Sequence, residues 1–305
     1  MRILLTGATG QLGTDLLPLL KQQGEVVAVS RAECDLSSVN AIRKLVGEVQ
    51  PAVIVNSAAY TAVNDAEAQV ESAYAINCTA VSTLAQESQK LGAMLIHYST
   101  DYVFDGNKPG AYTEGDVPAP LNIYGASKLA GERAVAAAGG RYLVLRTSWV
   151  YGAGGNNFLL TVQRLARDRE ELRIVDDQVG GPTSSVQLAQ ATARLIRQYS
   201  SIAESEFPSG LYHLTAGGTV SWCGFAKAIV AALGDRESFK VKQIVGISSD
   251  EYPTPARRPL NSVLCNSKFE RTFGFKLESW QSGLSEVICE IHLRESKNCG
   301  NREVK

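Results

Sequence analysis

The 305-residue sequence lacks the features that mark disulfide-rich, metal-binding and polyanion-binding proteins. Its six cysteines are scattered, with no Cys-x-x-Cys pair and no metal-ligand spacing, which argues against a disulfide framework. The 30 basic and 31 acidic residues leave a formal charge of -1, so the chain has no general attraction to nucleic acid or to anionic membranes. These absences favour a protein whose partners include neither nucleic acid nor a membrane.

Long hydrophobic runs are also missing from the sequence. No stretch approaches the roughly 18 apolar residues of a membrane span. The N-terminus, MRILLTGATGQLG, has too short an apolar run before its glycines for a signal peptide, so we expect a cytoplasmic protein. A hydrophobic content of 45% is ordinary for a globular chain, and the length is that of one large domain or two fused ones.

Short apolar runs alternate with longer helical patterns through the first half of the chain. The runs predict strands at Ile3–Thr6, Val26–Val29, Val53–Val55, Met94–Tyr98 and Tyr142–Arg146. The segments between them predict helices at Leu12–Gln22, Ser38–Glu48, Ala66–Leu91 (broken near its start) and Tyr124–Ala138. Continuous apolar strands are typical of a parallel sheet that is buried on both faces. We therefore predict an α/β fold with a doubly wound, parallel Rossmann-type sheet and a smaller, irregular α/β lobe.

The boundary between the two predicted lobes lies near residue 146. Residues 1–146 carry the regular alternation, and later segments are expected to return to this lobe. Residues 147–290 contain frequent glycine, proline and aromatic turns and form mainly the second lobe. A helical stretch from Gly283 to about Leu293 precedes residues 294–305, a polar tail that we expect to be disordered.

A glycine-rich loop follows the first predicted strand and opens the first helix. Its GxxGxxG pattern permits a tight turn, a close approach of the backbone to a pyrophosphate, and packing of the helix on the strand. The N-terminus of the helix adds free N–H groups and the positive end of its dipole. Glycines also end strands for structural reasons, so the motif gains weight from its place in a βαβ unit. The residues that we predict to bind a dinucleotide here are Gly7, Gly10, Gln11, Leu12 and Gly13.

The end of the second predicted strand distinguishes NAD from NADP. Ser30 and Arg31 can bind a 2′-phosphate, which favours NADPH, while Glu33 close by keeps NADH possible. The alternative is that Arg31 is only a solvated surface side chain. Asp35 and Leu36, just beyond, are placed to contact the adenine.

Tyr124 and Lys128 lie four residues apart, on one face of a predicted helix. Reduction of a carbonyl requires a proton for the alkoxide, and a tyrosine can supply that proton if a nearby cation stabilises its phenolate. Thr100 ends the fourth strand, at the edge of the sheet that holds ligands in open α/β folds, and offers a hydroxyl to the substrate oxygen. A YxxxK pattern alone is common by chance. With the glycine loop upstream, it predicts that Thr100, Tyr124 and Lys128 are catalytic.

These motifs, in this order, resemble the extended short-chain dehydrogenase/reductase superfamily. The segments STDYVFDG, PLNIYGASKLAGE, RTSWVYGAGGNNF, DDQVGGPT, YHLTAGGTVSW and TPARRPLNS are similar, more narrowly, to the dTDP-4-dehydrorhamnose reductase family. The resemblance runs from Met1 to roughly Ile291. It implies NADPH-dependent reduction of the 4-keto group of dTDP-4-dehydro-6-deoxy-L-mannose to dTDP-L-rhamnose, with the proton from Tyr124. Residues 1–146 are then the NADP-binding lobe and residues 147–290 mainly the substrate-binding lobe.

The resemblance also implies which residues surround each ligand. Trp149 would pack on the deoxysugar or the thymine, unless it is a core residue where the lobes meet. Arg258, or its neighbour Arg257, would bind the substrate pyrophosphate by bidentate hydrogen bonds. The cofactor would also contact Ala58, Ala59, Tyr60, Tyr124 and Lys128. The substrate would contact Thr100, Asp101, Tyr102, Trp149, Asn157, Gln178 and Arg258.

Some members of this family are dimers bridged by a divalent cation that glutamates hold. Here Asp15 and the segment Ser184–Gln187 form an incomplete carboxylate cluster, so we predict no metal site and no requirement for magnesium. We expect a monomer or homodimer whose partner is a dTDP-sugar. Two alternatives stay open: a reductase or epimerase of another nucleotide-sugar, and a non-catalytic NADP-binding regulatory subunit like that of methionine adenosyltransferase. The intact catalytic trio argues against the second.

Overall fold

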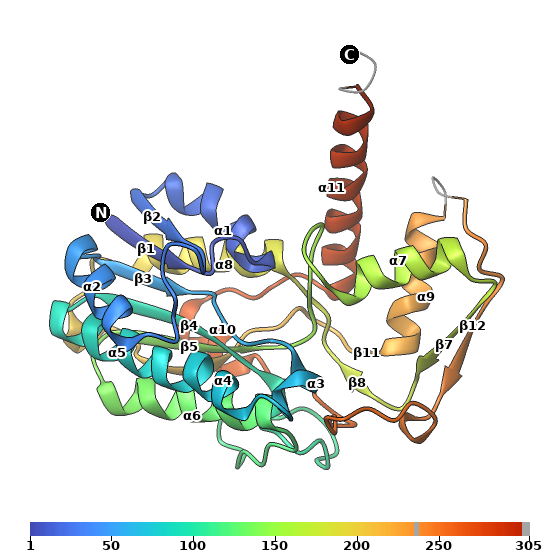
Figure 1. The fold of residues 1–305 in the computed structure, drawn as a ribbon, viewed down its shortest axis with the longest axis horizontal. Coiled ribbons are helices and arrows are strands. Elements are labelled where there is room, and N and C mark those ends of the chain that lie inside the picture. Colours follow the sequence, from blue (N-terminus) through green and yellow to red (C-terminus); the bar gives the residue numbers. More distant parts are fainter. Residues whose placement is uncertain (235–237, 301–305) are drawn as a thin grey trace.

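The computed structural model describes residues 1–234 and 238–300, and of residues 295–300 it describes the backbone alone. Within these residues the centre of the fold is a six-stranded sheet with the order β10-β5-β4-β3-β1-β2 (Figure 1). All its neighbouring strands run parallel. The strands are β1 (Arg2–Thr6), β2 (Glu25–Val29), β3 (Val53–Asn56), β4 (Met94–Thr100), β5 (Tyr142–Thr147) and β10 (Gly210–His213).

The structure confirms the predicted doubly wound parallel sheet, and each strand expected from the sequence lies within two residues of its expected bounds. β3 and β4 are buried along their whole length because helices cover both faces of the sheet. β2 differs from the expectation, since most of its residues are only partly buried. The reason is its place at the edge of the sheet, where fewer side chains cover it.

Helices lie on both faces of the sheet (Figure 1). α1, α8 and α10 pack against one face, while α2, α5 and α6 pack against the other. The side chain of Asn122 caps α6 by accepting a hydrogen bond from the Gly125 N–H at 2.8 Å. These helices are α1 (Gln11–Lys21), α2 (Val39–Val49), α5 (Ala80–Leu91), α6 (Ile123–Ala138), α8 (Ser185–Tyr199) and α10 (Ser267–Phe273).

The long helix expected at Ala66–Leu91 is divided into several pieces. α3 (Val63–Ala66) and α4 (Val70–Tyr74) precede α5, and a π-helical turn at Ala75–Thr79 joins α4 to α5. Such turns interrupt the regular backbone hydrogen bonds and often occur near functional sites. Here the turn places Asn77 against α6, the helix that carries Tyr124 and Lys128.

A smaller lobe with its own core lies beside the sheet, as expected. Phe225, Val287 and Leu159 are fully buried in that core. Short strands pair as β12 with β7, β11 with β8, and β6 with β9. The helices are α7 (Phe158–Asp168), α9 (Trp222–Leu233) and α11 (Trp280–Gly300), and the strands are β6 (Val150–Tyr151), β7 (Glu171–Val175), β8 (Val179–Gly180), β9 (Thr183–Ser184), β11 (Val220–Ser221) and β12 (Gln243–Ile247).

The C-terminal helix is longer than the sequence predicts. α11 projects from the smaller lobe and continues past Leu293, where the polar tail is expected, to Gly300. An ion pair between Glu290 and Arg294, one turn apart, supports its continuation. Residues 301–305 of the expected tail lie outside the described residues. No helix in the described chain is long and apolar enough to cross a membrane.

Candidate active site

The candidate residues gather at the carboxyl ends of the parallel strands. β1 pairs with β2 on one side and with β3 on the other, so the direction of chain progression reverses between β1 and β3. Ligands of open α/β sheets bind outside the strand ends at such a point. Thr6, Asn56 and Thr100 end β1, β3 and β4 there.

The glycine loop forms a cradle that side chains would fill. Gly7 has a φ of +70°, and a Cβ atom on it would lie 2.7 Å from the Ala58 nitrogen. A Cβ on Gly13 would lie 2.1 Å from the Gly7 carbonyl oxygen. Gly10 begins α1 without a capping side chain, which leaves the first N–H groups of the helix free for an anion. This geometry fits the pyrophosphate of a dinucleotide.

Gln11 and Asn157 join the glycine loop to the smaller lobe. The Asn157 amide donates to Gln11 Oε1 at 2.9 Å and to the carbonyl of Gly152 at 3.0 Å. Its oxygen caps α7 by accepting from the Leu160 N–H at 3.1 Å. The polar groups of Asn157 are thus engaged within the protein, and the residue does not line the substrate cavity described below. These bonds give Asn157 a structural role, and its contact with the sugar stays a prediction.

After the end of β2, the residues predicted to select the cofactor include two carboxylates, Glu33 and Asp35, and the charge of Arg31 acts on Asp35. Glu33 accepts hydrogen bonds from the Ser30 N–H at 2.7 Å and from the Ser30 hydroxyl, which lowers the pKa of its carboxyl. Arg31 is exposed, and Asp35 accepts from the Ser37 N–H at 3.0 Å. The Ser30 hydroxyl must turn away from Glu33 before it can donate to a 2′-phosphate.

Asn77 fixes the segment that follows β3. Its side chain accepts from the Tyr60 N–H at 2.9 Å and donates to the Tyr60 carbonyl at 3.1 Å. It also donates to the Ser127 hydroxyl on α6 at 3.0 Å. The main chain of Ala58–Tyr60 is therefore held between the glycine loop and the helix that carries Lys128.

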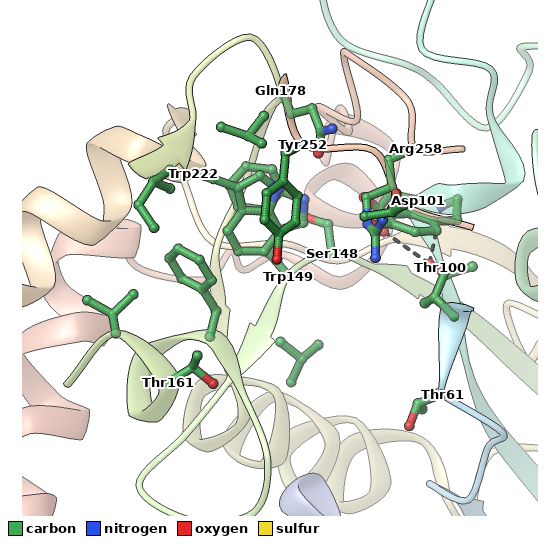
Figure 2. Close-up of a pocket in the computed structure, with 18 of the residues that line it drawn as sticks. Thr61, Thr100, Asp101, Ser148, Trp149, Thr161, Gln178, Trp222, Tyr252 and Arg258 are labelled. Atoms are coloured by element: carbon green, nitrogen blue, oxygen red, sulfur yellow. Dashed lines mark hydrogen bonds between the residues drawn. The ribbon is translucent and has the colours of Figure 1, made fainter. Parts of the chain in front are cut away.

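A cavity of about 690 Å³ lies between the sheet edge and the smaller lobe (Figure 2). Thr100 and Thr61 lie on one side of it, and Trp222 and Thr161 lie across from them. Six of the seven residues predicted to contact the substrate line this cavity, namely Thr100, Asp101, Tyr102, Trp149, Gln178 and Arg258. The predicted catalytic residue Tyr124 lines it as well.

Polar groups surround Tyr124 at the sheet end of the cavity. Burial raises the pKa of Tyr124 to about 12, although the Thr100 hydroxyl lowers it. Thr100 donates to Asp101 Oδ1 at 3.0 Å and accepts from the Tyr102 N–H at 3.2 Å. Burial also raises the pKa of Asp101 to about 7, and its Oδ2 has no hydrogen-bond partner in the described chain. Tyr124 is thus a protonated phenol at neutral pH.

Lys128 lies behind this group and does not line the cavity. Its amine donates to the Tyr98 carbonyl at 2.6 Å and lies 3.5 Å from His97 Nε2. Burial lowers the pKa of Lys128 to about 8. The sequence predicts that the charge of Lys128 lowers the pKa of Tyr124, but in this structure the desolvation of the phenol dominates.

The aromatic wall of the cavity depends on an unusual backbone at Trp149. This residue has a φ of 47°, in the left-handed region, and its ring stacks on Trp222 with centroids 3.5 Å apart. A Cβ on Gly180 would lie 2.5 Å from the Trp149 ring, so glycine is required there. Trp149 lines the cavity and is not a core residue.

Arg258 faces the cavity, whereas Arg257 is exposed outside it. The Arg258 guanidinium donates to Thr254 Oγ1 at 2.5 Å and to Asn64 Oδ1 at 3.2 Å. The Arg257 carbonyl accepts from the Asn122 amide at 2.7 Å, which ties this loop to the start of α6. Of the two arginines, Arg258 is the one placed to bind a ligand.

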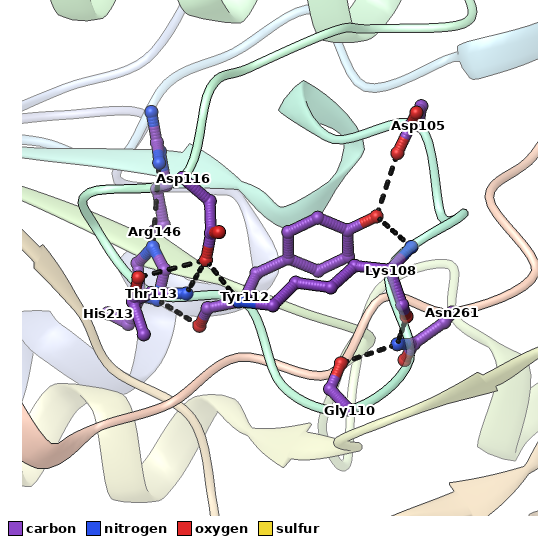
Figure 3. Close-up of polar contacts among 9 residues, drawn as sticks. All are labelled: Asp105, Lys108, Gly110, Tyr112, Thr113, Asp116, Arg146, His213 and Asn261. Carbon is purple, nitrogen blue, oxygen red and sulfur yellow. Dashed lines mark hydrogen bonds and ion pairs between the residues drawn. The ribbon is translucent and has the colours of Figure 1, made fainter.

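Polar contacts join the loop after Thr100 to Asn261, in the segment that follows Arg258 (Figure 3). The Tyr112 hydroxyl donates to Asp105 at 2.8 Å, and Asp116 pairs with Lys108 at 2.6 Å. Asn261, three residues after Arg258, donates to the carbonyl of Lys108 at 2.8 Å. These contacts hold residues 105–116 together and join them to the segment after Arg258.

Comparison with known proteins places this geometry in a family. The family model of the RmlD substrate binding domain matches residues 1–293. A dTDP-4-dehydrorhamnose reductase of Burkholderia thailandensis is 47% identical over 295 residues, which cover 95% of this chain and 99% of that protein. The chain belongs to the dTDP-4-dehydrorhamnose reductase family.

Solved structures of dTDP-4-dehydrorhamnose reductases share the fold. The Bacillus anthracis reductase, solved in complex with NADP, is 37% identical with a TM-score of 0.87, and the match covers 95% of this chain and 99% of that one. A Clostridium acetobutylicum reductase is 38% identical with a TM-score of 0.88, over 96% and 100% of the two chains.

Several residues that line the cavity of this reductase were not predicted from the sequence. Trp222 closes the aromatic wall, and Tyr252 lies at the rim beside Gln178, whose amide donates to Ser249 at 2.8 Å (Figure 2). The signal for Trp222 was present in the YHLTAGGTVSW segment, where the tryptophan begins α9. Other lining residues without a prediction include Thr61, Ser148, Thr161, Arg169 and Arg173.

Asp15 is the acidic residue on α1 that the sequence analysis considered for a cation. Burial raises the pKa of its carboxyl, with Ser185, Glu290 and Arg294 nearby. Across the part of the chain that is described, no group of three or more histidine, cysteine, aspartate or glutamate residues could hold a metal ion. The independence of magnesium stays a prediction.

Proposed function

We propose that this chain reduces the 4-keto group of dTDP-4-dehydro-6-deoxy-L-mannose, giving dTDP-L-rhamnose with NADPH as the reductant. The observation that carries the proposal is the meeting of Thr100 and Tyr124 at the sheet end of a cavity, in a chain with 47% identity to a named reductase. The NADP complex of the Bacillus anthracis relative supports the choice of cofactor. The cytoplasmic location and the monomeric or dimeric state stay predictions.

The proposed cofactor site extends from the glycine loop to α6. The N–H groups at the start of α1 bind the pyrophosphate between Gly7 and Gly13. Ser30 and Arg31 bind the 2′-phosphate, and Asp35 and Leu36 lie near the adenine. The remaining contacts come from Gly10, Gln11, Leu12, Ala58, Ala59, Tyr60, Tyr124 and Lys128.

In this proposal Tyr124 is the proton donor. NADPH supplies a hydride to the C4 carbon of the sugar. The Tyr124 phenol, which its raised pKa keeps protonated at neutral pH, gives its proton to the developing alkoxide. The Thr100 hydroxyl turns from Asp101, to which it donates in the free protein, and donates a hydrogen bond to the same oxygen, which stabilises the charge as it forms. Lys128, one helical turn beyond Tyr124, returns a proton to the phenolate.

The substrate occupies the cavity with its nucleotide towards the smaller lobe. The paired rings of Trp149 and Trp222 present an apolar wall for the thymine or the deoxysugar. Arg258 binds the pyrophosphate by charge-assisted hydrogen bonds. Asp101, Tyr102 and Gln178 complete the polar contacts to the sugar and phosphates.

Turnover of the sugar by the purified chain tests the proposed function directly. NADPH oxidation is followed by absorbance with the dTDP-4-keto sugar, and with the UDP and GDP forms as competitors for the nucleotide site. Rapid oxidation with the dTDP form alone is expected. Faster turnover of another nucleotide-sugar would assign a related reductase. NADPH binding without any turnover would make the chain a cofactor-binding subunit.

Removing the guanidinium at the end of β2 should change the choice of cofactor. For Arg31→Ala we expect kcat/KM with NADPH to fall about 10- to 100-fold, the value of a charge-assisted contact to the 2′-phosphate. The kcat/KM with NADH should stay the same. Parallel initial-rate measurements with both cofactors provide the check. An unchanged ratio of the two constants would remove Arg31 from the site.

The pH dependence of the reaction should report on Lys128. Because burial lowers the pKa of its amine to about 8, the cation is lost as the pH rises through that value. We therefore expect kcat/KM, which reports the free enzyme, to fall above about pH 8. Initial rates across the alkaline range measure this decrease, the alkaline limb of the pH profile. Activity that persists up to the ordinary lysine value of 10.5 would contradict the prediction.

A further inference from the structure

A continuous chain of buried polar side chains crosses the sheet beneath the active site. The Thr6 hydroxyl donates to Asn56 Oδ1 at 2.7 Å, and Asn56 Nδ2 lies 3.0 Å from His97 Nδ1. His97 Nε2 lies 3.5 Å from the Lys128 amine. All four residues are at most 2% exposed. The chain links the first, third and fourth strands to α6, and the proposed reaction uses only its last member.

The donors and acceptors of these buried residues determine the orientation of the Asn56 amide. Across the described residues, the Thr6 hydroxyl has one acceptor, Asn56 Oδ1. If the amide were turned around, the hydroxyl proton of Thr6 would be buried without a partner, at a cost of about 1–3 kcal/mol. Asn56 Nδ2 therefore donates, and His97 Nδ1 must accept.

The ring of His97 is consequently neutral, with its proton on Nε2. Burial and the nearby charge of Lys128 both hold the pKa of His97 well below its ordinary value. The Nε2–H is directed at the Lys128 amine. Two titratable groups act on that amine: His97 of β4 lies 3.5 Å from it, and Glu132 on α6 raises its pKa through its charge. Glu132 is itself paired with Arg146 of β5. Tyr124 lies one helical turn before Lys128 on α6.

We propose that His97 is a positioning residue for the proposed reduction: Thr6 and Asn56 hold it as the Nε2–H tautomer, which favours the neutral amine of Lys128. This inference rests on the proposed function, since it concerns how Lys128 serves Tyr124. When Tyr124 has given its proton to the sugar, a proton moves from the Lys128 ammonium to the phenolate. The neutral amine then accepts a hydrogen bond from His97 and regains a proton from solvent water.

The tautomer can be observed without any substrate. The chain has three histidines, so ¹⁵N-histidine labelling gives a small set of ring signals, and His97→Gln identifies those of His97. Long-range ¹H–¹⁵N spectra of the protein should show Nε2 protonated and Nδ1 unprotonated at every pH above about 6.5. A proton on Nδ1, or a charged ring, would overturn the proposal. Failure of the proposed function would instead appear as absence of turnover.

Asn56→Asp tests the coupling to Lys128. A carboxylate accepts from both Thr6 and His97 Nδ1–H, so the tautomer reverses and an Nε2 lone pair faces the ammonium. The alkaline limb of kcat/KM should then move up by about one pH unit. His97→Gln, which retains an N–H donor, should leave the limb in place. The alkaline decrease of kcat/KM could also move in Asn56→Asp while the proton of His97 stays on Nε2. That result would show an effect of the new negative charge alone and would contradict the proposed coupling between the His97 tautomer and Lys128.

Discussion

Tyr124→Phe is expected to lower kcat by about 10²- to 10⁴-fold, the usual contribution of a positioned general acid. Tyr124 lines the sheet end of the cavity, and its raised pKa makes the phenol a proton source at neutral pH. Phenylalanine retains the ring but has no proton to give. Steady-state NADPH oxidation with the dTDP-4-keto sugar measures the loss.

Two controls separate this chemical effect from damage to the fold. NADPH binding, measured by titration, should be retained in Tyr124→Phe because the glycine cradle is untouched. Tyr212→Phe removes a tyrosine hydroxyl that does not line the cavity and that donates to the Pro208 carbonyl at 2.9 Å. This variant should leave kcat nearly unchanged. If Tyr124→Phe kept wild-type kcat, another group would have to supply the proton.

Glu132→Gln is expected to reduce the free energy of unfolding by about 3–5 kcal/mol. Glu132 and Arg146 are 6% and 2% exposed and form a bidentate pair, with Nη2 to Oε2 at 2.6 Å. Ser99 also donates to Glu132 at 2.5 Å, and the Arg146 guanidinium lies over the Phe104 ring. Arg146 Nη1 lies 3.5 Å from His213 Nε2 (Figure 3). The variant leaves the guanidinium charged, buried and unpaired. Urea unfolding measures the change.

The chain provides a matched surface pair for comparison. Arg173 and Glu251 are also 2.6 Å apart, but they are 57% and 50% exposed, so Glu251→Gln should change the free energy of unfolding by less than about 1 kcal/mol. Adding Arg146→Met to Glu132→Gln removes the unpaired charge and should recover much of the loss. Equal effects of the buried and surface substitutions would show that burial of the Glu132 pair carries no special weight.

The first half of the fold was predictable because local patterns determine it. Strands such as Val53–Asn56 are short, apolar and separated by longer helical segments, so periodicity alone locates them. The π-helical turn at Ala75–Thr79 was not predictable, since it follows from packing against α6. Four strands of the smaller lobe, β6, β8, β9 and β11, have two residues each and are too short to leave a periodic signal.

The residues of the candidate site also differ in how far the sequence could predict them. Motifs beside regular elements predicted Gly7, Thr100 and Tyr124, because a strand end or a helix face fixes their direction. Asn157 looked equally suitable for a sugar, but its amide is used within the protein. His97 gave no sequence signal, since its importance depends on neighbours from two other strands.

The place of β10 has a consequence during synthesis on the ribosome. β10 pairs with β5 and forms one edge of the sheet, yet it lies at Gly210–His213, after much of the smaller lobe. Until His213 has left the exit tunnel, the apolar residues of β5 form an open sheet edge. Nascent chains stalled between these two strands are therefore expected to depend on chaperones, whereas those that have released β10 can close the sheet.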